Sequence, residues 1–142
     1  MSDIEIIHAT TVEIAGKAVL IIGPSGAGKS SLALQLMAMG AGLIADDRTQ
    51  IVRQQDILIA SVPSAIRGRI EARGVGLLRT NDVGPTPVAL VVDLEQQEEQ
   101  RLPKSHQHAL LGVTLPCLHN ANNTHFSAAI WISMQGSLDR SP

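Results

Sequence analysis

The feature that most constrains the fold is a glycine-rich segment lying between an apolar run and a helix-forming stretch. Residues Gly23 to Ser30 read GPSGAGKS and satisfy the pattern G-x-x-x-x-G-K-[ST] at every fixed position. The preceding apolar run, Ala18 to Ile22, is typical of a strand buried on both faces, and Lys29 to Met39 is rich in helix formers. A buried strand, this loop and a helix, in that order, are the context that the motif requires. The sequence therefore predicts a P-loop.

The residue types of this loop suit the binding of phosphate groups. Its glycines allow successive backbone N–H groups to point inward, and the following helix adds unpaired N–H groups and the positive end of its dipole. Lys29 is placed to reach the β- and γ-phosphates of a nucleotide, and the Ser30 hydroxyl is a ligand for Mg²⁺. No guanine-recognition motif is visible, so ATP is the expected nucleotide. The candidate nucleotide-binding residues are Gly23, Pro24, Ser25, Gly26, Ala27, Gly28, Lys29 and Ser30.

Size and composition exclude several other classes of protein. With 142 residues, 44% of them hydrophobic, and a net charge of −2, the chain is expected to form a single globular domain over residues 1–134 with a disordered tail over 135–142. The charge balance gives no footprint for nucleic acid, and no apolar run is long enough for a membrane span. The lone Cys117 fits a reducing compartment, so we expect a cytoplasmic protein.

Short apolar runs separated by turn residues predict an α/β domain with a mixed sheet and packed helices. Apart from the P-loop strand, strands are expected at 4–7, 12–14, 43–45, 50–53, 57–61, 88–92 and 113–118, and further helices at 62–70 and 126–134. The segment 95–101 is strongly charged and is expected to be a solvated loop. The antiparallel hairpins are too many for a simple doubly wound sheet.

Phosphoryl transfer also needs carboxylates near the P-loop, and three places could supply them. Asp93 ends an apolar strand like a Walker B acid, but an acid that caps a turn is the simpler interpretation. The adjacent pair Asp46–Asp47 ends the strand that follows the P-loop helix. Because two neighbouring carboxylates repel each other, a metal or cationic partner is favoured for this pair. Glu71 precedes a glycine-rich segment and is the third candidate.

The histidines are harder to interpret from spacing alone. His8 precedes the strand that leads into the P-loop, and a lone histidine in a strand is usually structural. The other four, His106, His108, His119 and His125, lack metal-ligand spacing with any cysteine or carboxylate, so the spacing indicates no zinc site.

Taken together, these segments resemble the catalytic domain of bacterial HPr kinase/phosphorylase. The likeness consists of His8 upstream of the GPSGAGKSS loop, then LIADDR at residues 43–48 and IEARGVGLL at residues 70–78, which is similar to the family signature E-I-R-G-L-G-I-I. It extends from about His8 to Asn120, and the short form is similar to versions from α-proteobacteria.

The resemblance implies a fold related to phosphoenolpyruvate carboxykinase, a hexameric assembly, and an ATP- and Mg²⁺-dependent serine kinase acting on an HPr-like phosphocarrier. It also implies removal of that phosphate by phosphorolysis. By motif, His8, Lys29, Asp46, Asp47 and Arg101 correspond to catalytic residues, with Asp47 as the proton acceptor, while Ser30 and Glu71 correspond to Mg²⁺ ligands. The metal role thus passes to Glu71, which leaves Asp93 structural.

The chain departs from the family pattern near its C-terminus. Where the family usually shows a basic P-V-x-P-G-R-N segment tied to dephosphorylation, residues 115–120 read LPCLHN, without the arginine. Phosphorolysis is therefore the part of the activity that the residues support least. Two alternatives to a protein kinase stay open: a small-molecule kinase or carboxykinase-like enzyme, and a module that binds ATP without chemistry.

Overall fold

The computed structural model describes residues 3–63 and 67–136, which form two helices and eleven strands. The helices are α1 (Lys29–Ala38) and α2 (Phe126–Gln135). The strands are β1 (Ile4–Ile7), β2 (Ala9–Ile14), β3 (Lys17–Ile22), β4 (Gly42–Ala45), β5 (Thr49–Gln54), β6 (Ile57–Ser61), β7 (Arg69–Ala72), β8 (Gly76–Arg79), β9 (Thr86–Gln97), β10 (His106–Leu110) and β11 (Val113–Asn120).

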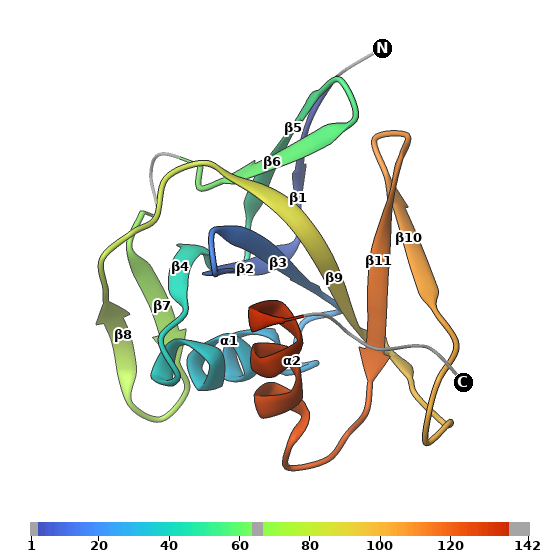
Figure 1. The fold of residues 1–142 in the computed structure, drawn as a ribbon. Helices are drawn as coiled ribbons and strands as arrows, with labels where there is room; N and C mark the ends of the chain where they lie inside the picture. The colour runs from blue at the N-terminus through green and yellow to red at the C-terminus, as the bar shows by residue number, and fades with distance from the viewer. Residues whose placement is uncertain (1–2, 64–66, 137–142) are drawn as a thin grey trace.

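Nine of these strands form one mixed sheet, which confirms the predicted α/β class with a mixed sheet. The order is β1-β5-β6-β9-β3-β2-β4, and β11 joins β9 with β10 at its outer edge. β3 and β11 are both parallel to β9, while the other pairings in this sheet are antiparallel. β6 pairs with the start of β9 and β11 with its end, so the sheet divides into two branches (Figure 1). β7 and β8 form a separate hairpin.

The strand that leads into the P-loop lies at the centre of the sheet and is buried on both faces, as its apolar run predicted. Along β3, Val19 and Ile21 join the core cluster beneath the helices, whereas Ala18 and Leu20 join the cluster on the opposite face. This alternation follows from the two-residue period of a strand. The two helices lie together against one face of the sheet (Figure 1), where Leu36 of α1 and Ile130 of α2 are fully buried.

Several segments differ from the sequence-based expectation. β2 runs unbroken from Ala9 to Ile14, where only residues 12–14 were expected to be a strand. β9 extends to Gln97 into the segment expected to be a loop, and β10 was not anticipated at all.

Two expectations concern residues only partly described. The helix expected at 62–70 is wrong where it can be compared, because Arg69 and Ile70 begin β7; residues 64–66 lie outside the described residues. Of the tail expected at 135–142, Gln135 is the last residue of α2, and 137–142 lie outside the described residues.

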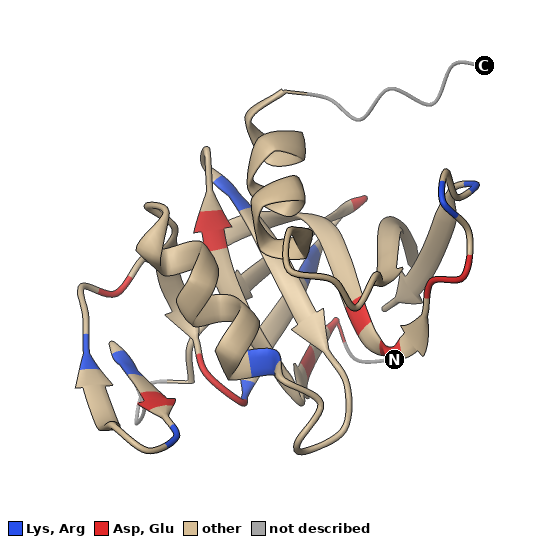
Figure 2. Ribbon diagram, turned by 90° about the horizontal axis from the view of Figure 1, so that it is seen from below, with Lys and Arg blue, Asp and Glu red and all other residues tan. Residues whose placement is uncertain are grey.

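Charged residues of both signs are distributed over the fold. Acidic and basic segments are interspersed along the ribbon (Figure 2). Neither described helix has the length and apolar character that crossing a membrane would require.

Candidate active site

The P-loop connects β3 to α1 with the backbone conformations that its glycines allow. Gly26 and Gly28 have φ values of 85° and 100°, in the left-handed region that favours glycine. The Ala27 N–H donates a hydrogen bond to the Pro24 carbonyl at 3.1 Å, which closes the turn. Gly28 is the N-cap of α1 and provides no side-chain cap, and the first turn carries no acid. The N-terminal N–H groups of α1 are therefore left without a side-chain partner, as an anion site requires.

Lys29 folds back over this loop. Its side chain is buried, and Nζ donates hydrogen bonds to the carbonyls of Gly23 at 2.8 Å and Pro24 at 3.1 Å. A buried ammonium group needs such partners, and the loop carbonyls supply them. The lysine is thus held directly over the turn where phosphate groups would lie.

Asp46 joins four segments of the chain at the end of β4. Its Oδ1 accepts hydrogen bonds from the hydroxyl of Ser30 at 2.7 Å and from that of Thr10 at 3.0 Å. Its Oδ2 accepts the backbone N–H of Glu71 at 3.1 Å. One carboxylate therefore links the P-loop helix, β2 and the β7–β8 hairpin. Ser30 and Asp46 together present hard oxygen donors at one place, which is the donor set that Mg²⁺ prefers.

Asp47 stands next to this group but faces solvent. Its side chain is 64% exposed and its Oδ1 contacts the Nε2 of His8, whose side chain is 49% exposed. Its backbone has a φ of 70°, which is uncommon for a non-glycine residue, and its N–H donates to the Thr10 hydroxyl at 3.2 Å. The strained turn thereby aims the two successive carboxylates differently, Asp46 inward and Asp47 outward.

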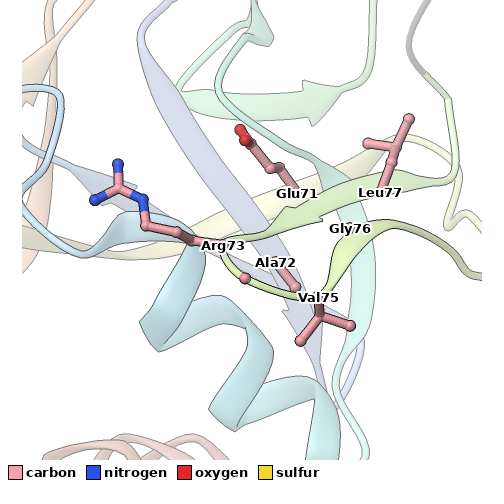
Figure 3. A pocket seen from close by; sticks show the side chains of 7 residues that line it. Glu71, Ala72, Arg73, Val75, Gly76 and Leu77 are labelled. Atoms are coloured by element: carbon pink, nitrogen blue, oxygen red, sulfur yellow. The ribbon is translucent and has the colours of Figure 1, made fainter.

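Glu71 joins the site through its backbone N–H, which donates to Asp46, while its side chain follows the alternation of β7. Ile70 and Ala72 are buried, so Glu71 between them lies on the exposed side of the strand. The turn after it contains Gly74 and Gly76, which have φ values of 85° and 138°, and residues 71–77 line an open pocket of about 520 Å³. Figure 3 shows Glu71 and Arg73 extending from the hairpin in directions different from that of Val75.

The structure therefore gathers six of the predicted residues: His8, Lys29, Ser30, Asp46, Asp47 and Glu71. Asp93 pairs in register with Ile22, the last residue before the P-loop, and its carboxylate accepts the Glu95 N–H at 3.0 Å. Arg101 is exposed in the connection between β9 and β10, and within the described residues no hydrogen bond or ion pair joins it to the other candidates. Its proposed role in the active site stays a prediction.

Thr10 is the site residue that sequence reasoning missed. It is fully buried and serves both acids, donating to the Asp46 carboxylate and accepting from the Asp47 backbone. The available signal was a pair of threonines, Thr10 and Thr11, followed by an apolar residue in a short strand.

The structure brings two of the other histidines together with a glutamate, although their spacing in the sequence indicates no zinc site. Glu98, His106 and His119 lie with ligand atoms all within 4.8 Å of one another. The hydrogen bond with His106, followed by the backbone N–H of Gln100, lowers the pKa of the Glu98 carboxyl below its usual value of 4.5. Spacing along the sequence does not reveal this cluster, because the three residues come from different strands or strand ends.

A strand, a glycine-rich loop and a helix, built into a mixed sheet with carboxylates beside the loop, define a P-loop protein. Over residues 1–119 the chain matches the family described as the HPr Serine kinase C-terminal domain, and it belongs to that family.

Individual relatives agree with this assignment. The chain is 39% identical over 105 residues to the HPr kinase/phosphorylase of Peptoclostridium acidaminophilum, a match that covers 66% of this chain and 33% of the relative. To the HPr kinase/phosphorylase of Azoarcus sp. it is 36% identical over 124 residues, covering 78% of this chain and 40% of the relative. The chain thus spans roughly a third of the length of such curated relatives.

The solved structure of the Hpr(Ser) kinase/phosphatase from Coxiella burnetii has a similar fold. It superposes with a TM-score of 0.79 at 25% sequence identity, covering 92% of this chain and 88% of that chain. The resemblance drawn from the sequence motifs is confirmed at the level of the family and the fold.

Proposed function

We propose that this chain is an ATP- and Mg²⁺-dependent protein-serine kinase whose acceptor is an HPr-like phosphocarrier. The observation that carries the proposal is the pairing of Asp47 with His8 on an open surface beside the P-loop. Asp47 is 64% exposed, so the hydroxyl of a folded protein can approach it. An enclosed pocket would instead favour a small-molecule acceptor.

The proposed chemistry assigns one task to each residue. The P-loop and Lys29 hold the phosphates of ATP. Asp47, oriented by His8 and by the Thr10 hydroxyl beneath its backbone, accepts the proton of the attacking serine hydroxyl. The serine oxygen forms a bond to the γ-phosphorus while the bond to the bridging oxygen of ADP breaks.

The metal role follows from the oxygen donors already in place. Ser30 and Asp46, with Glu71 on the adjoining hairpin, would hold Mg²⁺. When bound, Mg²⁺ neutralises charge on the phosphates. Asp46 is suited to this because its three hydrogen bonds fix its orientation in advance.

The proposal is tested by incubating the protein with γ-labelled ATP, Mg²⁺ and a purified HPr-like carrier from the same cell. Label should arrive on a carrier serine and be lost with Asp47→Asn or Lys29→Ala. The matched control is Asp56→Asn, because Asp56 is an exposed acid in the β5–β6 turn and its ion-pair partner, Arg53, also lies outside the site. Its rate should equal that of the parent.

Three other outcomes are informative. Tight ATP binding without transfer to any carrier would contradict the kinase and favour a nucleotide-sensing module. Transfer to a metabolite but not to a carrier would favour a small-molecule kinase. Loss of the carrier phosphoserine on addition of inorganic phosphate, with release of pyrophosphate, would show that phosphorolysis is retained despite the altered segment 115–120. Light scattering of the same sample tests the expected homo-oligomer, a hexamer.

A further inference from the structure

A cluster of metal-ligating side chains lies outside the site described above, at the junction of three strands. His106 is the first residue of β10, His119 lies near the end of β11, and Glu98 directly follows β9. His106 pairs across the ladder with Cys117, two residues before His119, so both histidines lie on the same face. The Glu98 N–H donates to the Asn120 carbonyl at 2.8 Å, which fixes Glu98 beside His119.

The side chains converge closely. Nε2 of His106 lies 2.7 Å from Oε1 of Glu98, and the rings of His106 and His119 are stacked with centroids 3.7 Å apart and planes 10° from parallel. The other carboxylate oxygen, Oε2, accepts the N–H groups of Glu99 and Gln100, each at 3.1 Å. Glu98 is therefore oriented by the backbone, and its Oε1 is left facing the histidines.

The donor set of this cluster differs from that of the P-loop site. Two imidazole nitrogens and one carboxylate oxygen suit Zn²⁺ and neighbouring transition metals, whereas Mg²⁺ prefers oxygen alone. The side chains of Glu98 and His106 are 12% and 28% exposed, so the group is sheltered yet open to an ion from solvent. Binding requires the two stacked rings to tilt until one nitrogen of each points at the same position, with the remaining coordination taken by water.

We propose that Glu98, His106 and His119 bind a Zn²⁺-type divalent transition-metal ion at a site separate from the expected Mg²⁺ site. The ion joins the ends of β9, β10 and β11, so its role is to stabilise this branch of the sheet. The proposal does not depend on the kinase activity.

The position gives such an ion a structural connection to the P-loop. His119 pairs with Asp93, but the next residue, Asn120, pairs with Gln97. Residues 94–96 of β9 therefore have no partner in β11 and form an irregular excursion, as in a β-bulge. A Cβ atom placed on Gly23 would lie 3.4 Å from the Leu94 Cβ and 3.7 Å from the Glu95 nitrogen. The excursion therefore packs against the first residue of the P-loop, and Glu98 stands just beyond its end.

The test is a titration of the whole protein with ZnCl₂ in chelator-free buffer that contains excess Mg²⁺. Two-bond ¹H–¹⁵N spectra of the histidine side chains should show shifts at His106 and His119, and none at His108 or His125. Calorimetry should give one site, with affinity lowered more than about tenfold by Glu98→Gln, His106→Gln or His119→Gln. His108→Gln, two residues along the same strand, is the matched control and should bind like the parent.

Thermal melts separate a loss of the site from a loss of the fold. Zn²⁺ should raise the Tm of the parent and of His108→Gln, and leave that of His119→Gln unchanged. Should a variant fail to fold, the spectra of the parent protein decide alone. Binding that persists in His119→Gln, that disappears instead with Asp47→Asn, or that leaves the signals of His106 and His119 unmoved would overturn the proposal.

Discussion

At the scale of single residues, Thr10 is the least obvious part of the candidate active site. Its hydroxyl is buried between the Asp46 carboxylate and the Asp47 backbone, so it sets the positions of both acids. Thr11, its neighbour in β2, is equally buried but bonds instead to the hydroxyl of Thr49 at 2.7 Å. Of the two adjacent threonines, Thr10 therefore supports the candidate site, whereas Thr11 supports only the fold.

Thr10→Val keeps the shape of the side chain and removes its hydrogen bonds. We expect kcat for phosphoryl transfer to fall by at least about tenfold, since a misplacement on the ångström scale at a catalytic group is costly. Both Thr10→Val and Thr11→Val should lower the free energy of unfolding, by about 0.5–1.5 kcal/mol for each buried hydrogen bond removed. The first removes the acceptor of the Asp47 N–H, and the second removes one partner of the Thr49 hydroxyl, which still donates to the Ala9 carbonyl. Kinetics and urea titration of both variants check this. Equal kcat values in the two would contradict the role assigned to Thr10.

Burial dominates the chemistry of Cys117. It is 3% exposed, and burial, followed by the charge of Asp93, raises the pKa of its thiol to about 11 from the usual 9.0. At pH 8 the native thiolate fraction is then about 100-fold below that of the unfolded chain, since two pKa units separate them. Alkylation by iodoacetamide should be slower in the native protein than in urea by at least this factor.

The raised pKa of the Cys117 thiol also makes the free energy of unfolding depend on pH. Below pH 9 the thiol is protonated in both states and contributes no pH dependence. Between pH 9 and about 11 the unfolded chain loses its proton first, so the stability of the parent should fall relative to Cys117→Ala. Urea titrations of both proteins at pH 8 and pH 10.5 measure the difference. If the free energies of unfolding of the two proteins differ by the same amount at both pH values, folding does not hold the thiol in its protonated form.

At the scale of elements, close packing of β4 depends on a glycine. A Cβ atom on Gly42 would lie 2.4 Å from a methyl carbon of Val83, the residue whose N–H donates to the Leu43 carbonyl at 2.9 Å. This contact covers the outer side of β4, where the bridge from Leu43 to Asp82 also lies.

Gly42→Ala should therefore lower the free energy of unfolding by about 1–3 kcal/mol through overpacking. Gly84→Ala is the matched control, because a Cβ atom there meets nothing within 4 Å. Differential scanning calorimetry of both variants should show a lower Tm for the first alone. Equal Tm values would mean that Val83 moves aside without cost.

Some elements of this fold can be predicted from the sequence, and others cannot. The unit of β3, P-loop and α1 was predicted because its signal is local: an apolar run, fixed glycines and a helical stretch. β10 was missed because its first three residues, His106 to His108, are polar and none of its five residues is buried. The role of Thr10 and the meeting of Glu98 with His119 depend on strand pairing between distant segments, which no local pattern records.

At the scale of the whole molecule, β9 connects every part of the sheet. It pairs with β6 at its start, with β3 along its middle and with β11 at its end. The P-loop strand on one edge and the strand of His119 on the other therefore share a single twelve-residue strand. The proposed metal site on one side and the proposed nucleotide site on the other therefore both depend on the native conformation of β9.

The central place of β3 also has a consequence for amide hydrogen exchange. The backbone of Val19 to Ile21 is paired on both sides and the side chains are fully buried, so these amides should exchange only when the whole domain unfolds. A few residues later, Ser25 and Gly26 are exposed in the loop and should exchange within seconds. Mass spectrometry with and without ATP should show slower exchange in the loop, where the ligand would cover the backbone. Exchange of Val19 to Ile21 should slow as well, because a ligand that binds only the folded state makes global unfolding rarer. One short peptide would therefore report both local protection by the ligand and the gain in global stability.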